Sequence, residues 1–310
     1  MIVAVTGGTG FIGRYLIARH IARGDQVRYL TRKKSRVIAG ASAYIADLCS
    51  PTDDLQQFVQ GVDVLYHCAA ELHDETKMHN TNVLGTANLL AVAKGKVKRW
   101  VQLSSTGVYG IRPESDIDEN AAMNPANAYE ISKAEADNLV LSAIRHQNLE
   151  CVVLRPSNVY GVDMPNSSLF QLIKMINRGW FFFIGRKGAI ANYIHVENVI
   201  DALMLCGVSK LPANGRVYVI SDYRKLEDFV SIIASALAKK APQKRLPESL
   251  IRLLATVFGH IPQFPLSLSR VKALTNRHIY KTTRIEAELG FKNTISMEKG
   301  ITELVNHVKN

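Results

Sequence analysis

The first half of the chain alternates short apolar runs with longer stretches in which apolar residues recur at helical spacing. The apolar runs predict strands at residues 1–7, 26–31, 42–47, 62–70, 98–105 and 149–161. The periodic stretches predict helices at 11–24, 52–61, 80–95 and 127–147. Parallel strands need a long crossover between them, which a helix supplies. The alternation therefore predicts an α/β fold, with a doubly wound parallel sheet covered by helices on both faces.

The pattern changes after residue 165. A helix is predicted at 169–179, an aromatic run follows at 180–185, a turn and helix at 192–207, and a strand at 215–221. From about residue 240 the chain is amphipathic, basic and punctuated by proline. We expect a dinucleotide-binding domain over 1–165, rejoined by parts of 190–235. A smaller, interleaved substrate-binding lobe is expected over 166–189 and 236–310.

Composition places the chain among globular proteins. It has 310 residues, of which 47% are hydrophobic and 21% charged. No apolar run reaches the roughly 18 residues that span a bilayer, and no signal peptide precedes the first strand. Four cysteines, Cys49, Cys68, Cys151 and Cys206, lie far apart without metal-ligand spacing. We expect a cytoplasmic protein without a metal site.

The net charge of +11 indicates an anionic partner. The basic stretch at 94–100 is short and lies between a helix and a strand, which is typical of a solvated turn. A phosphorylated small molecule is therefore favoured over nucleic acid.

A glycine loop, VTGGTGFIG at 5–13, links the first strand to the first helix. Gly7, Gly10 and Gly13 allow a tight turn, close approach to a pyrophosphate and packing of helix on strand. The helix N-terminus then holds the anion. A structural turn is the alternative, but the flanking strand and helix favour a Rossmann-type dinucleotide site.

The second strand ends in a cluster of positive charge, YLTRKKSR at 29–36. Dinucleotide sites for NAD place an acid about 20 residues after the glycines, where this chain has Lys33. A guanidinium binds a 2′-phosphate, whereas an acid repels it. The cluster predicts NADP(H), with Arg32 as the first candidate and Lys33 as the second. NAD and a merely solvated turn remain alternatives.

A catalytic pair is indicated by Tyr129 and Lys133, which share one face of a predicted helix. A nearby ammonium is expected to lower the pKa of the tyrosine, which then exchanges a proton with a carbinol oxygen while a nicotinamide moves the hydride. Ser104, Ser105 and Thr106 end the fifth predicted strand, where ligands bind in open parallel sheets.

With these motifs the chain resembles the extended short-chain dehydrogenase/reductase family, the branch that contains nucleotide-sugar epimerases, dehydratases and ketoreductases. The resemblance covers nearly the whole chain. It is carried by TGGTGFIG, the pair Asp47-Leu48, HCAA at 67–70, NVLGTANLL at 82–90, LSSTGVYG, YEISK, RPSNVYG and NYIHVENV, in family order.

The resemblance implies roles for single residues. Tyr129 would be the general acid/base, Lys133 would bind the nicotinamide ribose, and Ser105 would hydrogen-bond the reacting oxygen. Together with the glycine loop and the basic strand end, it gives the expected cofactor contacts: Gly7, Gly10, Phe11, Ile12, Gly13, Arg32, Lys33, Asp47, Leu48, Ala69, Ala70, Ser104, Tyr129, Lys133, Pro156 and Val159. Thr106 and Asn158 are the expected substrate contacts. Asn82 matches an asparagine that supports a proton relay, with a structural role as the alternative, and His195 is expected to be architectural.

Two departures from the family pattern bear on the reaction. Thr106 and Gly107 replace the Asp-Glu pair of dehydratases, which argues against elimination of water. Ala191 and Asn192 replace the Arg-Asp of UDP-galactose-type epimerases, so the usual diphosphate clamp is absent, although Arg178, Arg186 or Lys187 could substitute.

Because of two apolar segments, the sequence does not decide between a sugar and a lipophilic substrate. The run at 179–185 is expected to be a buried edge strand, with a lipophilic wall or membrane-facing rim as the alternative; the segment at 246–266 is similarly apolar.

We rank first an NADP(H)-dependent ketoreductase or dehydrogenase acting on a nucleotide-linked deoxysugar. A 4-epimerase with tightly bound NAD and a reductase of a lipophilic alcohol, of hydroxysteroid or dihydroflavonol type, are alternatives. A non-catalytic NADP sensor would not need the Ser105, Tyr129 and Lys133 set. The resemblance implies a homodimer.

Overall fold

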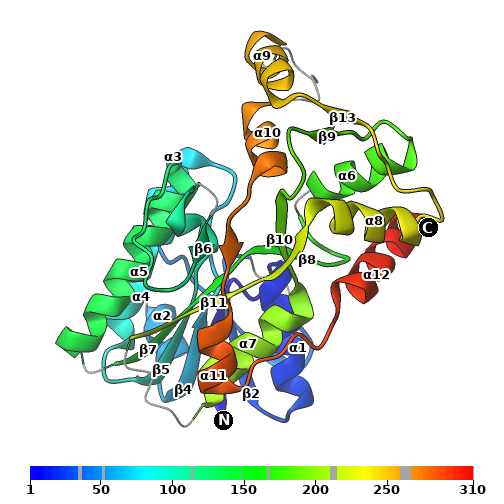
Figure 1. The fold of residues 1–310 in the computed structure, drawn as a ribbon. Coiled ribbons are helices and arrows are strands. Elements are labelled where there is room, and N and C mark those ends of the chain that lie inside the picture. The colour runs from blue at the N-terminus through cyan, green and yellow to red at the C-terminus, as the bar shows by residue number, and fades with distance from the viewer. Residues whose placement is uncertain are drawn as a thin grey trace.

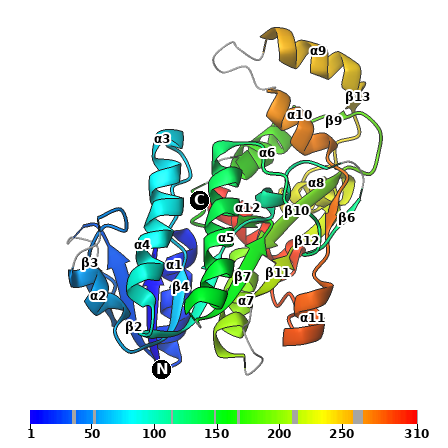
Figure 2. The same cartoon turned by 90° about the vertical axis from the view of Figure 1, so that its left-hand side faces the viewer.

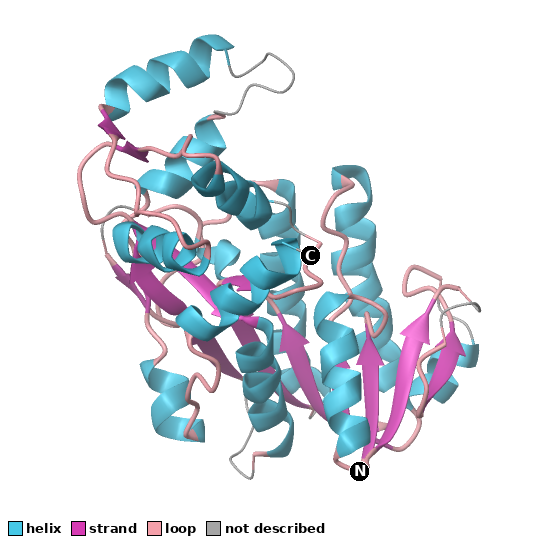
Figure 3. Cartoon of the chain, turned by 90° about the vertical axis from the view of Figure 1, so that its right-hand side faces the viewer, coloured by secondary structure: helices cyan, strands magenta, loops and turns pink. Residues whose placement is uncertain are grey.

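The computed structural model describes residues 1–33, 37–50, 53–112, 115–147, 149–165, 168–209, 215–258 and 267–309 (Figure 1). Its main sheet has seven parallel strands in the order β11-β7-β5-β4-β1-β2-β3. Their bounds are β1 (Ile2–Thr6), β2 (Gln26–Thr31), β3 (Ala41–Ile45), β4 (Val62–His67), β5 (Val97–Leu103), β7 (Glu150–Pro156) and β11 (Arg216–Ile220). Figure 3 shows the strand arrows of this sheet pointing the same way.

Helices cover both faces of the main sheet (Figure 2). On one face lie α1 (Phe11–Ala22) and α7 (Val196–Val208), whose apolar side chains share a core with the sheet. On the other face lie α2 (Asp53–Val59), α4 (Gly85–Ala93) and α5 (Ala128–Gln147), which bury a second core. The predicted α/β doubly wound fold is confirmed.

The order of strands reverses at β1. From β1 the chain continues to β2 and β3 on one side, whereas β4, β5, β7 and β11 lie on the other. In open parallel sheets such a reversal leaves a crevice at the carboxyl ends of the strands, where ligands bind.

Three elements differ from the sequence prediction. The predicted helix at 80–95 begins earlier, at Glu75, and consists of α3 (Glu75–Met78), a π-helical turn (His79–Leu84) and α4. The predicted strand at 149–161 divides at Ser157, because β7 stays in the main sheet while β8 (Asn158–Tyr160) leaves it to pair with β10 (Ile190–His195). Residues 190–195 therefore form a strand where a turn was predicted, and only a long-range pairing stabilises it.

A lobe above the carboxyl ends of the strands is assembled from separate stretches of chain (Figure 1). It contains β8, β9 (Phe183–Ile184), β10, β12 (Asp222–Lys225), β13 (Arg245–Leu246), α6 (Ser168–Asn177), α8 (Leu226–Ala236), α9 (Glu248–Phe258), α10 (Leu268–Thr275) and α12 (Met297–Lys309). Residues from α6, α8, α12 and the aromatic run share one core. Two short strands, β6 (Asp116–Ile117) and β14 (Ile279–Tyr280), pair with each other, and α11 (Thr283–Leu289) lies against β11. The domain boundaries drawn from the sequence stay a prediction.

The described helices include none that is both long and apolar enough to cross a membrane.

Candidate functional site

A cavity of about 1020 Å³ opens at the carboxyl ends of the main strands. This volume is at the upper end of that of small-molecule sites. Among the predicted site residues, those that line it are Gly7, Gly10, Phe11, Ile12, Gly13, Arg32, Asp47, Leu48, Ala69, Ala70, Ser104, Ser105, Tyr129, Lys133, Pro156, Asn158 and Val159. Lys33 and Thr106 do not line it. The sequence missed other lining residues, among them Thr31, Glu71, Leu72, His73, Asp163, Met164 and Pro165.

The glycine loop fits a bound anion. Gly7 has φ of +67°, and a Cβ there would come within 2.7 Å of the Ala69 nitrogen. A Cβ on Gly13 would lie 2.2 Å from the Gly7 carbonyl oxygen. The helix α1 that follows has no side-chain cap and no acidic residue in its first turn. Its N-terminal N–H groups and positive dipole end therefore suit a pyrophosphate.

Two neighbouring cations at the end of β2 differ in whether they line the cavity. Arg32 is exposed and lines the cavity, as do Asp47 and Leu48. The backbone N–H of Lys33 donates to Thr31 Oγ1 at 3.2 Å, and Lys33 lies outside the lining. Lys34 and Arg36, which belong to the same charge cluster, lie outside the described residues.

Ser105, Tyr129 and Lys133 meet at the carboxyl end of β5. The side chains of Tyr129 and Ser105 are hydrogen-bonded. Ser105 Oγ also accepts from the Gly107 N–H at 3.0 Å, which starts a 3₁₀ turn over Thr106–Tyr109. Lys133 is buried, and its Nζ donates to the Leu103 carbonyl oxygen at 2.6 Å.

The pKa values in this cluster differ from the sequence expectation. Burial raises the pKa of Tyr129 to about 12, although its hydrogen bond with Ser105 acts in the other direction. Burial also lowers the pKa of Lys133. The expected lowering of the Tyr129 pKa by Lys133 is not found in the polypeptide itself, because burial dominates and the ammonium is bonded to Leu103. Tyr129 is therefore a protonated phenol at neutral pH.

A buried ion pair lies below the catalytic cluster, and the sequence analysis missed it. Asp137 Oδ2 accepts from Ser104 Oγ at 2.8 Å and from Arg155 Nε at 3.0 Å. Arg155 Nη1 donates to the Tyr109 hydroxyl at 2.9 Å. The charge of Asp137 raises the pKa of Lys133 against the effect of burial. The signal was available, because Asp137 follows Lys133 by one helical turn.

Asn82 fixes the loop that follows β4. In the π-helical turn, its Oδ1 accepts from the Glu71 N–H at 2.7 Å. Its Nδ2 donates to the Glu71 carbonyl oxygen at 3.1 Å and to Ser132 Oγ at 2.9 Å. These contacts join the loop to the catalytic helix, so they favour the structural role over the relay.

Glu71 organises the same loop at the edge of the cavity. Its Oε1 accepts from the backbone N–H groups of Leu72, His73 and Asp74 at 3.0, 3.0 and 3.2 Å. The hydrogen bond from His73 is the largest of the effects that lower the pKa of the carboxyl group. These hydrogen bonds keep the negative charge of Glu71 at the loop backbone rather than directing it toward a ligand.

The substrate end of the cavity lacks a diphosphate clamp. Asn158 lines it and donates to the Asn192 carbonyl oxygen at 3.0 Å, while Asn192 donates to the His278 carbonyl oxygen. Ala191 is buried in the lobe core. None of Arg178, Arg186 and Lys187 lines the cavity. Among the described lining residues, the lysines and arginines are Arg14, Arg32 and Lys133.

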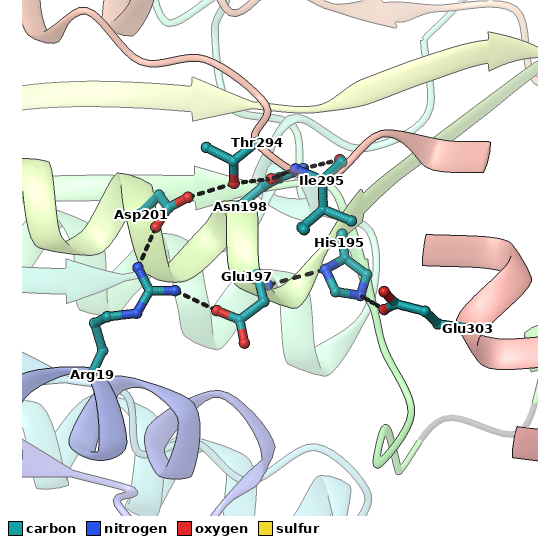
Figure 4. A network of polar contacts seen from close by, with 8 residues as sticks. All are labelled: Arg19, His195, Glu197, Asn198, Asp201, Thr294, Ile295 and Glu303. Atoms are coloured by element: carbon teal, nitrogen blue, oxygen red, sulfur yellow. Dashed lines mark hydrogen bonds and ion pairs between the residues drawn. The ribbon is translucent and has the colours of Figure 1, made fainter. Parts of the chain in front are cut away.

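His195 lies away from the cavity, in a network that joins α1, α7 and α12 (Figure 4). Its Nδ1 accepts from the Glu197 N–H at 3.3 Å and its Nε2 lies 3.9 Å from a carboxylate oxygen of Glu303. Within the described residues no group of three histidine, cysteine, aspartate or glutamate side chains could hold a metal ion.

The family model described as "NAD dependent epimerase/dehydratase family" matches residues 3–221. This chain belongs to that family. It is therefore an NAD(P)-dependent enzyme of the extended short-chain dehydrogenase/reductase type, whose members include reductases, dehydrogenases and epimerases.

Relatives extend along the whole chain. A 4-hydroxy-2-methyl-3-oxo-4-farnesyl-3,4-dihydroquinoline-1-oxide ketoreductase from Stigmatella aurantiaca is 28% identical, covering 97% of this chain and 94% of the relative. A 3β-hydroxysteroid-dehydrogenase/decarboxylase from Arabidopsis thaliana is 25% identical, covering 97% and 78%. The structure of a UDP-glucuronic acid 4-epimerase from Bacillus cereus in complex with NAD has a TM-score of 0.78 at 18% identity, covering 100% and 99%. This last likeness shows the fold alone.

Proposed function

We propose that this enzyme uses NADPH to reduce a ketone of a lipophilic substrate to a secondary alcohol. The observation that carries the proposal is the substrate end of the cavity. The cavity that Ser105 and Tyr129 line is also lined by the apolar residues Leu72, Met164 and Pro165. Of its described cations, Lys133 is bonded to the Leu103 carbonyl oxygen and Arg14 lies 3.8 Å from a carboxylate oxygen of Asp163, which leaves Arg32 at the end of β2. A nucleotide-linked sugar, which the motifs ranked first, would need a cation for its diphosphate. The names of two relatives contain lipophilic substrates, which supports ranking a lipophilic ketone above a nucleotide-linked sugar.

The choice of NADPH is supported by Arg32. It lines the cavity and directly follows β2, at the strand end where the adenosine ribose is expected. Three features would hold the cofactor: the α1 N-terminus for the pyrophosphate, Asp47 and Leu48 for the adenine, and Lys133 for the nicotinamide ribose. When bound, the nicotinamide supplies the hydride.

The side chains would supply the proton and hold the carbonyl. The Tyr129 hydroxyl donates its proton to the carbonyl oxygen as the carbon–oxygen double bond becomes single. The raised pKa of Tyr129 suits this direction, because the phenol is fully protonated at neutral pH. Ser105 Oγ donates a second hydrogen bond to the same oxygen.

Turnover measurements test the proposal. Purified enzyme with NADPH is given ketones with long alkyl or fused-ring bodies and, separately, UDP-linked sugars, while NADPH oxidation is followed. We expect kcat/KM to be about a hundredfold higher for the best lipophilic ketone. Interconversion of UDP-sugars without net oxidation of NADPH would overturn the proposal in favour of the epimerase.

Two leucines of equal exposure give a matched pair. Leu72 and Leu84 are both 47% exposed, but only Leu72 lines the cavity. Leu72→Ser should raise KM for the lipophilic ketone by about tenfold, whereas Leu84→Ser should leave it unchanged. Equal effects of the two substitutions would contradict an apolar substrate wall at Leu72.

A further inference from the structure

Helix α9 has a wider apolar surface than the fold covers. Ile251 and Ala255 are buried against Ile184 and Val271. On the opposite side, Leu250, Leu253 and Val257 are 46%, 61% and 57% exposed. Their spacing of three and four residues puts them on one face, next to each other. The helix thus carries a second apolar stripe that no described element packs against.

The stripe lies at an extremity of the molecule. Figures 1 and 2 show α9 projecting beyond α10 at the end of the lobe, far from the N-terminus and on the side to which the main strands point. Trp180, which precedes the strand that supports α9, is 66% exposed. The projection of α9 places the stripe where it would meet a large flat surface.

The surroundings of the stripe are strongly basic. Residues 239–278 contain eight lysines and arginines and one acidic residue, Glu248. Arg245 pairs with Glu227 and Arg252 with Glu248, at 2.6 and 2.7 Å. Further exposed cations in this stretch of sequence are Lys239, Lys240, Lys244 and Lys272, the last of them on α10. This stretch therefore supplies seven of the eleven net positive charges.

We propose that α9 docks this enzyme onto the surface of an anionic phospholipid bilayer. The stripe would enter the boundary between headgroups and acyl chains with α9 lying in the plane of the membrane. The surrounding lysines would contact the anionic headgroups while their stems cover apolar surface. A second copy of the chain fits less well, because a stable interface buries about 800 Å² per partner, and three aliphatic side chains on one projecting helix offer far less.

Vesicle flotation tests the proposal, and its outcome does not depend on the proposed reaction. Full-length protein is mixed with phosphatidylcholine vesicles, with or without about one third phosphatidylglycerol. We expect binding to the anionic vesicles that weakens as salt rises, since exposed charges are screened over about 8 Å at physiological ionic strength. Absence of binding to anionic vesicles at low salt would overturn the proposal.

Surface variants show which residues bind. The triple variant Leu250→Ser, Leu253→Ser, Val257→Ser should reduce the affinity for anionic vesicles by about tenfold or more. Ile45→Ser removes a similarly exposed apolar side chain from the distant edge strand β3 and should leave binding unchanged. Lys272→Glu should weaken binding by about fivefold or more, and Lys94→Glu, at the opposite end, should not. Equal effects of test and control variants would contradict docking through α9.

A fluorescence measurement covers the case in which the triple variant does not fold. Of the two tryptophans, Trp100 is fully buried and Trp180 is exposed. In a Trp180→Phe, Leu253→Trp variant, emission should shift to shorter wavelength with anionic vesicles and be quenched by brominated lipid. Unchanged emission, or a stripe-dependent dimer seen by sedimentation without lipid, would overturn the proposal.

Discussion

At the scale of single residues, Arg32 and Lys33 are neighbours in the chain but differ in what they border. Arg32 lines the cavity and Lys33 does not. Arg32→Ala should weaken NADPH binding by about tenfold or more, because a charge-assisted contact to phosphate is lost, and leave NADH binding nearly unchanged. Titration calorimetry with both cofactors measures this.

Lys33→Ala is the matched control. It removes the same charge from the same strand end, so a loss of NADPH affinity equal to that of Arg32→Ala would show that only the general potential matters. Equal weakening of NADPH and NADH by Arg32→Ala would remove the argument for a 2′-phosphate.

Tyr129 offers a second residue-scale prediction. Tyr129→Phe keeps the ring and removes the hydroxyl, so kcat should fall by about 10²- to 10⁴-fold while the Kd of the cofactor changes by less than about twofold. Stopped-flow turnover and binding titration measure the two quantities. Turnover near the wild-type rate would show that another group moves the proton.

The sequence predicted single residues well where the family motifs fix both type and spacing. Gly7, Gly13, Ser105, Tyr129 and Lys133 all border one cavity. It failed where two distant segments create the environment. The Asp137–Arg155 pair joins α5 to β7, and the raised pKa of Tyr129 follows from burial that spacing does not reveal.

At the scale of elements, α7 is clamped to the segment before α12 by one amide (Figure 4). The buried Asn198 donates to the Ile295 carbonyl oxygen at 2.8 Å and accepts from its N–H at 2.9 Å. Asn198→Ala should lower the free energy of unfolding by about 2 kcal/mol, because two backbone groups lose their partner. Urea denaturation measures this loss.

Thr294→Val is the comparison for that clamp. The exposed Thr294 hydroxyl lies 2.7 Å from Asp201 Oδ2 and 3.2 Å from Asn198 Oδ1, so its loss, which leaves both bonds of Asn198 to Ile295 intact, should cost about 0.5–1 kcal/mol. A cost for Asn198→Ala no larger than this would show that water replaces the amide.

Element boundaries were predicted least well. The stretch at 149–161 was predicted as one strand, yet β8 leaves the sheet to pair with β10, a partner more than 30 residues away. The π-helical turn at 79–84 follows from the bonds of Asn82 to Glu71 and Ser132, which connect three elements. The local pattern of apolar residues predicts neither the departure of β8 from the sheet nor the π-helical turn.

At the scale of the whole molecule, a buried histidine makes the stability depend on pH. His67 lies between Thr6 Oγ1 at 2.6 Å and Thr86 Oγ1 at 2.9 Å, and burial lowers its pKa to about 3. Unfolded, it titrates near 6.5. Between pH 6.5 and 3 the unfolded chain therefore binds a proton that the folded chain does not, and stability falls with pH by up to about 1.4 kcal/mol per unit from this group. Above pH 6.5 the contribution is fully present.

His67→Asn should make the acid limb shallower, while lowering stability at pH 7 by about 1–3 kcal/mol through poorer hydrogen bonding. Denaturation curves at several pH values between 3 and 7 show both effects. His73→Asn, at an exposed histidine, should leave the slope unchanged. An unchanged slope in His67→Asn would assign the acid sensitivity to other groups.

The homodimer and the cytoplasmic location stay predictions at this scale. The sequence analysis noted that 246–266 is apolar, but it could not predict which side chains of α9 stay uncovered, because Leu250 and Ile251 are equally apolar and differ only in what packs on them.

The placement of the cavity has a consequence for synthesis on the ribosome. Every described residue that lines it lies between Gly7 and Pro165, and six of the seven main strands precede that point. The seventh, β11, is an edge strand made more than 50 residues later. A growing chain thus carries the complete cofactor groove before α9 leaves the exit tunnel.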